Sequence, residues 1–274
     1  ALSLQDEAAR RIVAATLQVL FTCISTDDPE SPLFLFNQGT QESNAKALTL
    51  LRKEVKRAPA ESGPLIAISL ALDDALREGW VDSPSETVAE MLRRASECLR
   101  LRPLYWVCHQ VAGTAFLVTG QREKMVNAFE QMVAGNGLPV AYWYLGDALA
   151  LAGRPEEAID SLKEAMRWAP DDRQIFLWLL AKAKAHFAAE RYADARDSAL
   201  RSIELFPHYW WTHQVLAASY GQLGLSDEAR VALNESLRLK STTLEQVSTS
   251  PYLSTMDTGH RGRYVAGLSI AGME

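Results

Sequence analysis

The residues that could bind a metal ion are a cysteine with a neighbouring histidine and a few further histidines. Cys108 and His109 are adjacent, so on a helix their side chains point about 100° apart and cannot easily share a metal ion. His208 and His213 are five positions apart, which puts them on different faces of a helix. His186 precedes a phenylalanine in an apolar stretch and is expected to pack in a core or a groove. These spacings favour packing over a metal site.

Acidic pairs and a glycine-rich turn are the other candidates. Glu156-Glu157 follows a proline at an expected helix start, where acidic side chains stabilise the helix dipole. Gly135-Asn136-Gly137 is predicted to be a turn, because no strand precedes it and no lysine follows it to cradle an anion. The motifs HExxH, CxxC, GxSxG and GK[ST] do not occur in the sequence. We therefore predict no catalytic residues, no metal, no cofactor and no enzyme activity; an all-α enzyme is the least favoured alternative.

Composition limits the class of partner and the compartment. The net charge of −6 argues against binding of nucleic acid or an anionic membrane by the overall field of the chain. No apolar run approaches the 18 residues of a membrane span. Three cysteines without a framework spacing predict reduced, buried thiols in a cytoplasmic protein. The N-terminus has no secretory signal pattern, and it begins at Ala1 instead of Met, which favours a longer protein that starts upstream.

The elements that must position any site follow a recurring pattern. From Pro139 to Asp172, small and large apolar residues stand at the offsets of the 34-residue tetratricopeptide repeat, a helix–turn–helix unit. The pattern predicts an all-α fold, a right-handed superhelix of antiparallel helix pairs in which each pair packs on the next. Ala158 and Ala195 are three residues further apart than one period, which predicts a longer first helix in that repeat. The residues that carry the pattern are Leu145, Gly146, Ala158, Leu162, Ala165 and Pro170, then Gly113, Phe116 and Phe129 upstream, and Tyr192, Ala195, Pro207, Leu216, Tyr220 and Ala229 downstream.

The pattern divides the chain into four regions. Residues 1–30 are predicted to be a linker helix, about 4–21, and a polar turn. Residues 31–103 are predicted to form two degenerate helical hairpins, with helices at 44–58, 64–78 and 84–102, the last opened by a capping box of Ser83 and Glu86. Residues 104–240 hold four clearer repeats, and residues 241–274 a Ser/Thr-rich segment and a weak capping helix at about 261–273. The helix pairs of the clearer repeats are expected at 104–119 with 123–134, 139–152 with 155–168, 174–190 with 192–205, and 209–223 with 226–239.

The first helix of each repeat is expected to line a concave groove. Its floor combines aromatic, apolar and amide side chains and holds a single lysine, Lys184, so it does not suit a clamp for a peptide carboxylate. Such a floor suits an amphipathic or extended protein segment, from a partner or from the chain's own terminal helix. The sequence leaves the oligomeric state open. The predicted groove residues are Val107, Gln110, Thr114, Trp143, Asp147, Leu180, Lys184, Phe187, Trp211 and Gln214.

Both ends of the chain resemble parts of a known group of proteins. LSLQDEAARRIVAATLQVL (residues 2–20) and RYVAGLSIAGME (residues 263–274) are similar to the helices that open and close the C-terminal region of certain bacterial signalling proteins. GRPEEAIDSLKEAMRWAPDD and residues 183–207 are similar to the middle of that region. In that family a class III adenylate or guanylate cyclase domain, or a winged-helix DNA-binding domain, precedes the repeats. The sequence departs from the family pattern at Met91, Met125, Lys182 and Ser241.

The resemblance and the repeats together imply a function. The chain is expected to be a non-catalytic protein-interaction and regulatory module of a cytoplasmic bacterial signalling protein, of the cyclase or the transcription-regulator type. The alternative is a ligand- or peptide-sensing receptor, which needs an enclosed pocket around Trp143 and Trp211.

Overall fold

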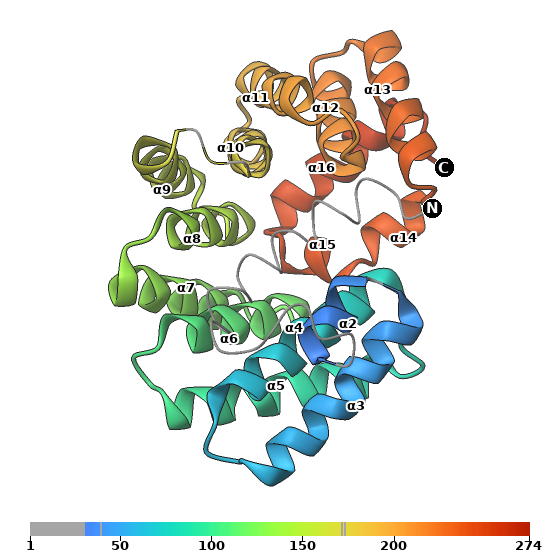
Figure 1. Cartoon of the computed structure of the whole chain (residues 1–274). Helices are drawn as coiled ribbons and strands as arrows, with labels where there is room; N and C mark the ends of the chain where they lie inside the picture. The colour runs from blue at the N-terminus through green and yellow to red at the C-terminus, as the bar shows by residue number, and fades with distance from the viewer. Residues whose placement is uncertain (1–30, 39, 171, 173) are drawn as a thin grey trace. The chain divides into compact units, whose positions relative to one another are not determined.

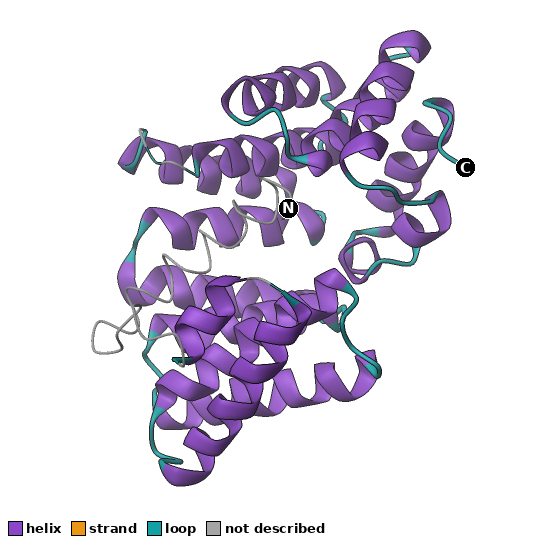
Figure 2. Ribbon diagram, turned by 45° about the vertical axis from the view of Figure 1, so that its right-hand side comes forward, coloured by secondary structure: helices purple, strands orange, loops and turns teal. Residues whose placement is uncertain are grey.

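The computed structural model describes residues 31–38, 40–170, 172 and 174–274, and every regular element in this part of the chain is an α-helix (Figures 1 and 2). The described helices form two compact units, residues 31–116 and 117–274. The predicted all-α class is confirmed. The helix expected at 4–21 lies outside the described residues.

The first unit is built from helices of 7 to 18 residues that bury their apolar faces on one another. They are α2 (Pro32–Gln38), α3 (Gln41–Arg57), α4 (Ser62–Glu78), α5 (Pro84–Leu101) and α6 (Trp106–Val118), whose last two residues belong to the second unit. The helix α4 packs against both α3 and α5. Its Leu65 and Ile68 are fully buried, as is Met91 of α5.

A side-chain cap sets the start of α3 but not that of α5. The helix α3 starts at Gln41, ahead of the expected Asn44, because the Thr40 hydroxyl accepts a hydrogen bond from the Ser43 backbone N–H at 3.1 Å. The capping box predicted at Ser83 is wrong. The Ser83 side chain makes no cap hydrogen bond, and its Oγ lies 3.4 Å from Oγ of Ser85 instead.

The prediction of reduced thiols is wrong for two of the three cysteines. Cys98, near the end of α5, and Cys108, near the start of α6, form a disulfide, and both side chains are fully buried. The chain turns back between them around Pro103, which brings their Cα atoms within 5.3 Å. Cys23 lies outside the described residues.

The second unit follows the repeat pattern closely. After α7 (Arg122–Asn136) come the pairs α8 (Pro139–Leu151) with α9 (Pro155–Trp168), α10 (Ile175–Ala188) with α11 (Tyr192–Leu205), and α12 (Trp210–Gln222) with α13 (Ser226–Leu239). The ends of α9, α11 and α13 match the predicted ends. The predicted longer first helix is wrong: α10 has 14 residues against 13 in α8 and α12, so most of the added length lies in the connection before it.

Small residues hold the paired helices of a repeat close together. A Cβ on Gly146 of α8 would lie 2.6 Å from Cγ of Leu162 on α9, too close for any side chain. Buried serines add a hydrogen bond that the repeat pattern did not predict. Ser202 of α11 and Ser236 of α13, at equivalent positions, donate to the carbonyls of Phe176 and Trp210 in the partner helices.

Residues 243–274, called the C-terminal segment below, are more ordered than the sequence predicted. The Ser/Thr-rich part forms two short helices, α14 (Leu244–Ser248) and α15 (Pro251–Thr255), capped by the hydroxyls of Thr243 and Ser250. The last helix, α16 (Thr258–Ile270), starts earlier than the expected 261, because the Asp257 carboxylate accepts from the N–H groups of Gly259 and His260. The helix α16 packs along α12 within the second unit (Figure 1).

Candidate binding groove of the second unit

The predicted groove residues divide between the two units. Val107, Gln110 and Thr114 lie on α6 in the first unit, where Val107 and Gln110 are buried. The other seven lie on the first helices of the three repeats in the second unit. These are Trp143 and Asp147 on α8, Leu180, Lys184 and Phe187 on α10, and Trp211 and Gln214 on α12.

Three of these residues meet a tyrosine of the C-terminal segment in a partly buried cluster. Lys184 is 6% exposed and forms an ion pair with Asp147. Its ammonium nitrogen lies 4.5 Å from the ring centroid of Trp211 and 4.8 Å from that of Tyr252. The rings of Trp211 and Tyr252 meet edge to face, with centroids 4.4 Å apart. A cation between two aromatic faces stabilises this arrangement where water is excluded.

The Tyr252 hydroxyl is a hydrogen-bond donor in this cluster. It lies 3.4 Å from Oδ1 of Asp147. Burial, and next the charge of Asp147, raise the pKa of Tyr252 well above its usual value, so the phenol keeps its proton. We call Asp147, Lys184 and Trp211 the cation cluster.

A second contact joins Gln214 and Phe187 to α16. The Tyr264 hydroxyl donates to Oε1 of Gln214 at 3.0 Å, and both side chains are almost completely buried. The Phe187 ring packs against the rings of Tyr264 and His260, at centroid distances of 5.6 and 5.8 Å. Burial and then the nearby Arg263 charge lower the pKa of His260 to about 4, so this imidazole is neutral at pH 7.

The backbones of α12 and α16 touch where two glycines cross. A Cβ on Gly267 would lie 2.5 Å from the Ala218 carbonyl oxygen, and a Cβ on Gly221 would lie 2.3 Å from the Gly267 carbonyl oxygen. No residue larger than glycine fits at either position without moving a helix.

Hydrogen bonds to backbone carbonyls extend the contact over residues 255–263 of the segment. The Asp257 N–H donates to the Leu151 carbonyl at 2.9 Å, and the Gln222 amide donates to the Arg263 carbonyl at 2.6 Å. The Thr255 hydroxyl donates to the Leu117 carbonyl at 2.7 Å. The segment is therefore held as an ordered helical ligand of its own repeats.

Two predicted groove residues make other contacts. The Trp143 ring lies against Tyr144, at a centroid distance of 4.6 Å, and Leu180 is buried within α10 at 2% exposure. Asp147, Lys184, Phe187, Trp211 and Gln214 are the five that the structure brings together around the C-terminal segment. Sequence reasoning missed Tyr252, Tyr264, Gly221 and Gly267, and only the unusual glycines within helical patterns gave a signal.

The histidines outside the groove have structural contacts. His109 and His213 each place Nε2 2.8 Å from a proline carbonyl six residues earlier, Pro103 and Pro207, at the turn before their helix. Burial lowers the pKa of His186. Among the described residues, no three His, Cys, Asp or Glu side chains gather to hold a metal ion. In the same part of the chain, no helix has the length and apolarity to cross a bilayer.

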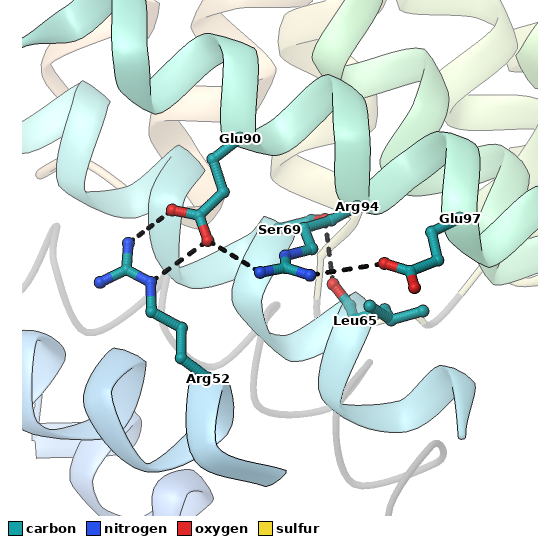
Figure 3. A network of polar contacts seen from close by, with 6 residues as sticks. All are labelled: Arg52, Leu65, Ser69, Glu90, Arg94 and Glu97. Atoms are coloured by element: carbon teal, nitrogen blue, oxygen red, sulfur yellow. Dashed lines mark hydrogen bonds and ion pairs between the residues drawn. The ribbon is translucent and has the colours of Figure 1, made fainter. Parts of the chain in front are cut away.

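The first unit carries a separate charged network that joins α3 to α5 (Figure 3). Glu90, 9% exposed, accepts from Nη2 of Arg52 at 2.5 Å and from Arg94 at 3.3 Å, and Arg94 also contacts Glu97. Burial by itself raises the pKa of Glu90, but the hydrogen bonds and charges of Arg52 and Arg94 outweigh it and lower the pKa. The network pairs a nearly buried carboxylate with two guanidinium groups and so links the two helices.

Comparisons with known proteins agree with this architecture. A tetratricopeptide repeat family model matches residues 139–172. None of the curated proteins matches the chain. A chain of the crystal structure of the Cut9–Hcn1 hetero-tetramer of the APC/C is similar in fold, with a TM-score of 0.66 and 16% identity over 98% of this chain. The present chain spans about half, 51%, of the length of that protein.

Two further solved structures share the fold at low identity. A tetratricopeptide repeat protein from Parabacteroides merdae has a TM-score of 0.57 and 12% identity, covering 88% of this chain and 98% of its own. PilW, a type IV pilus biogenesis factor, has a TM-score of 0.54 and 13% identity, covering 75% of this chain and 89% of its own. At these identities the likeness establishes the fold alone. The chain contains a tetratricopeptide repeat region and has an all-α fold of antiparallel helix pairs.

Proposed function

We propose that this chain is a non-catalytic protein-interaction and regulatory module. The groove of its second unit binds a helical protein segment, which is the chain's own C-terminal segment in the resting state and a partner segment in the engaged state. The observation that carries the proposal is the convergence of Asp147, Lys184, Phe187, Trp211 and Gln214 on the C-terminal segment. Tetratricopeptide folds commonly present a concave surface to protein segments.

The chemistry of the contact favours a protein ligand over a small molecule. The Tyr252 ring occupies the space beside Trp211 and Lys184, where a receptor for a small ligand needs a cavity. The glycine crossing requires a ligand that has a helical backbone of its own. These features do not favour the small-ligand receptor.

A tethered occupant makes the module regulatory. A segment joined to its own groove competes at an effective concentration in the millimolar range, so a partner must bind tightly to replace it. The apparent affinity for the partner equals the intrinsic affinity multiplied by the fraction of molecules whose groove is open. Any event that loosens the C-terminal segment therefore increases partner binding.

The parent of this module is proposed to be a cytoplasmic bacterial signalling protein. Support comes from the resemblance of residues 2–20 and 263–274 to the ends of the repeat region that follows a cyclase or winged-helix domain. The net charge of −6 supports a protein partner over nucleic acid. Sequencing the gene upstream of the Ala1 codon tests this context, and a start codon directly before Ala1 would contradict it.

The Cys98–Cys108 disulfide gives a test of the cytoplasmic location. Cytosolic reductants keep most thiols reduced, whereas disulfides persist in oxidising compartments. Because both side chains are fully buried in the folded chain, cells are quenched in acid, and alkylation of the unfolded protein followed by mass spectrometry measures the state of the pair. A cytoplasmic protein is expected to be alkylated at both residues, and a protected pair would argue for an oxidising compartment.

Two glycines of α16 provide matched variants to test the groove. Gly267→Gln inserts a side chain against the Ala218 carbonyl, whereas Gly262→Gln enters open space on the same helix. We expect Gly267→Gln to release the C-terminal segment and a fluorescein-labelled peptide of residues 243–274 to bind it. Gly262→Gln should stay closed and exclude the peptide. Fluorescence anisotropy measures binding, and failure of the peptide to bind the folded Gly267→Gln chain contradicts the proposal.

A further inference from the structure

We infer that the groove selects a partner segment by two tyrosine hydroxyls and a glycine at fixed spacing. The first tyrosine stands on a short helical turn, the second follows 12 positions later on a capped helix, and the glycine comes three positions after that, as in Tyr252, Tyr264 and Gly267. This inference rests on the proposed function, because it assigns chemistry to the partner of that groove. The C-terminal segment shows which contacts such a partner makes.

The first tyrosine is selected by the cation cluster. The Lys184 ammonium lies over the faces of two aromatic rings, one from the groove and one from the segment, so an aliphatic side chain at this place loses an attractive contact. The hydroxyl adds a contact to Oδ1 of Asp147, which a phenylalanine does not make. A ring with a neutral hydroxyl therefore fits better than any other side chain.

The second tyrosine is selected by a buried amide. Gln214 is 1% exposed, and Nε2 of this residue has no hydrogen-bond partner among the described residues. The Tyr264 hydroxyl satisfies the amide oxygen at 3.0 Å. A phenylalanine there leaves the whole buried amide unpaired, and a site built for a hydroxyl discriminates strongly against a ligand that lacks it.

The glycine sets the depth at which the partner helix lies. Its Cα approaches the backbone of Ala218 so closely that a Cβ would meet the carbonyl oxygen at 2.5 Å. Any other residue raises the partner helix away from α12. The hydroxyl of the tyrosine before that helix then no longer reaches Asp147, and the hydroxyl of the tyrosine on it no longer reaches Gln214.

The spacing also specifies the shape of the partner. Asp257 lies between the two tyrosines and caps α16, while its own N–H donates to the Leu151 carbonyl. The partner is therefore a protein segment that bends at a capped helix start, with the first tyrosine before the bend and the second after it. This combination of features is not found in a nucleic acid or a small metabolite.

The experiment compares peptides on the full chain carrying Gly267→Gln, with the Gly262→Gln chain as the closed control. The probes are the peptide of residues 243–274 and its versions Tyr252→Phe, Tyr264→Phe and Gly267→Gln. We expect each phenylalanine version to bind about tenfold more weakly and the glutamine version not to bind. In a groove that also carries Gln214→Leu, the Tyr264→Phe version should bind as well as the unchanged peptide.

The outcomes separate this inference from the function on which it rests. An unchanged peptide that fails to bind contradicts both. An unchanged peptide that binds no better than the phenylalanine versions overturns the inference and leaves the function standing.

A second measurement covers the case in which Gly267→Gln does not fold. In the otherwise unchanged full chain, Tyr252→Phe and Tyr264→Phe should each speed hydrogen exchange of the α16 amides about tenfold. Exchange rates that stay unchanged in both variants overturn the inference.

Discussion

Single residues decide how closely the helices of this chain approach one another. Gly146 illustrates this, because a Cβ there would lie 2.6 Å from Cγ of Leu162 and 3.1 Å from the Ala158 carbonyl oxygen. We expect Gly146→Ala to lower the free energy of unfolding by about 1–3 kcal/mol through overpacking. Gly262→Ala is the control, since its Cβ meets open space and it should stabilise by up to about 1 kcal/mol. Urea unfolding measures both, and equal stabilities would contradict the alignment of the repeat.

Glu90 gives a pH-dependent prediction at the same scale. The folded pKa of Glu90 is lowered, so its ion pairs contribute stability above the ordinary pKa of 4.5, and this contribution is lost as the pH falls through the folded value. Glu90→Gln should cost about 1–2 kcal/mol at pH 7, and the difference from the unchanged chain should shrink below about pH 4. Urea unfolding at both pH values checks this.

Glu97→Gln is the matched control for that experiment. Glu97 forms an ion pair with Arg94 at 3.4 Å, and its side chain, 30% exposed, is more exposed than that of Glu90 at 12%. Glu97→Gln should lower the free energy of unfolding less than Glu90→Gln does. A difference that is independent of pH for Glu90→Gln would show that the carboxylate charge has no stabilising role.

At the scale of the element, caps determine where the C-terminal helices start. Asp257 accepts from the backbone N–H of His260 and Gly259, which lowers its pKa against the opposing effect of burial. Asp257→Ala should destabilise α16 by about 1 kcal/mol. Asp257→Asn keeps a hydrogen-bond acceptor and should destabilise α16 by only about 0.3 kcal/mol. Hydrogen exchange of the α16 amides measures the effect. Equal protection in both variants would show that docking, and not the cap, sets the stability of α16.

The repeat helices were largely predictable from the sequence, and the reason is local. The second helix of each repeat starts at a residue such as Pro155 or Tyr192 after a short turn. Its apolar residues recur at helical spacing, so periodicity locates both of its ends. The connection before α10 was misread because residue spacing alone does not say whether extra residues lengthen a helix or a loop. The two short helices α14 and α15 were missed because the hydroxyls of Thr243 and Ser250 stabilise them, and they have too few residues to show a period.

The candidate site was predictable in part. Repeat geometry correctly placed Asp147, Lys184, Phe187, Trp211 and Gln214 on the first helices of their pairs. Their contacts with Tyr252 and Tyr264 join residues that are 41 or more positions apart in the chain, as Trp211 and Tyr252 are. Helical periodicity holds no information about such separations. The docking of the C-terminal helix was therefore expected only as one of several possible occupants.

At the scale of the whole molecule, one covalent bond distinguishes the first unit. The Cys98–Cys108 bond closes a loop with a sequence separation of 10, and cross-linking a loop of this size stabilises the folded state by about 2–3 kcal/mol. Reduction should therefore lower the melting temperature of the purified chain. Thermal unfolding with and without a phosphine reductant measures the change, and the double variant Cys98→Ala and Cys108→Ala should be insensitive to it. An unchanged melting temperature on reduction would show that the bond adds no stability.

The close contact between Gly221 and Gly267 also predicts how these two positions evolve. Each glycine is required only while the other helix lies against it, so the two positions are under joint selection. Relatives that keep the last helix are expected to keep both glycines, whereas a lineage that loses this helix is free to accept larger residues at position 221. Covariation of two positions 46 residues apart would thus record, across species, whether the groove is covered by its own chain.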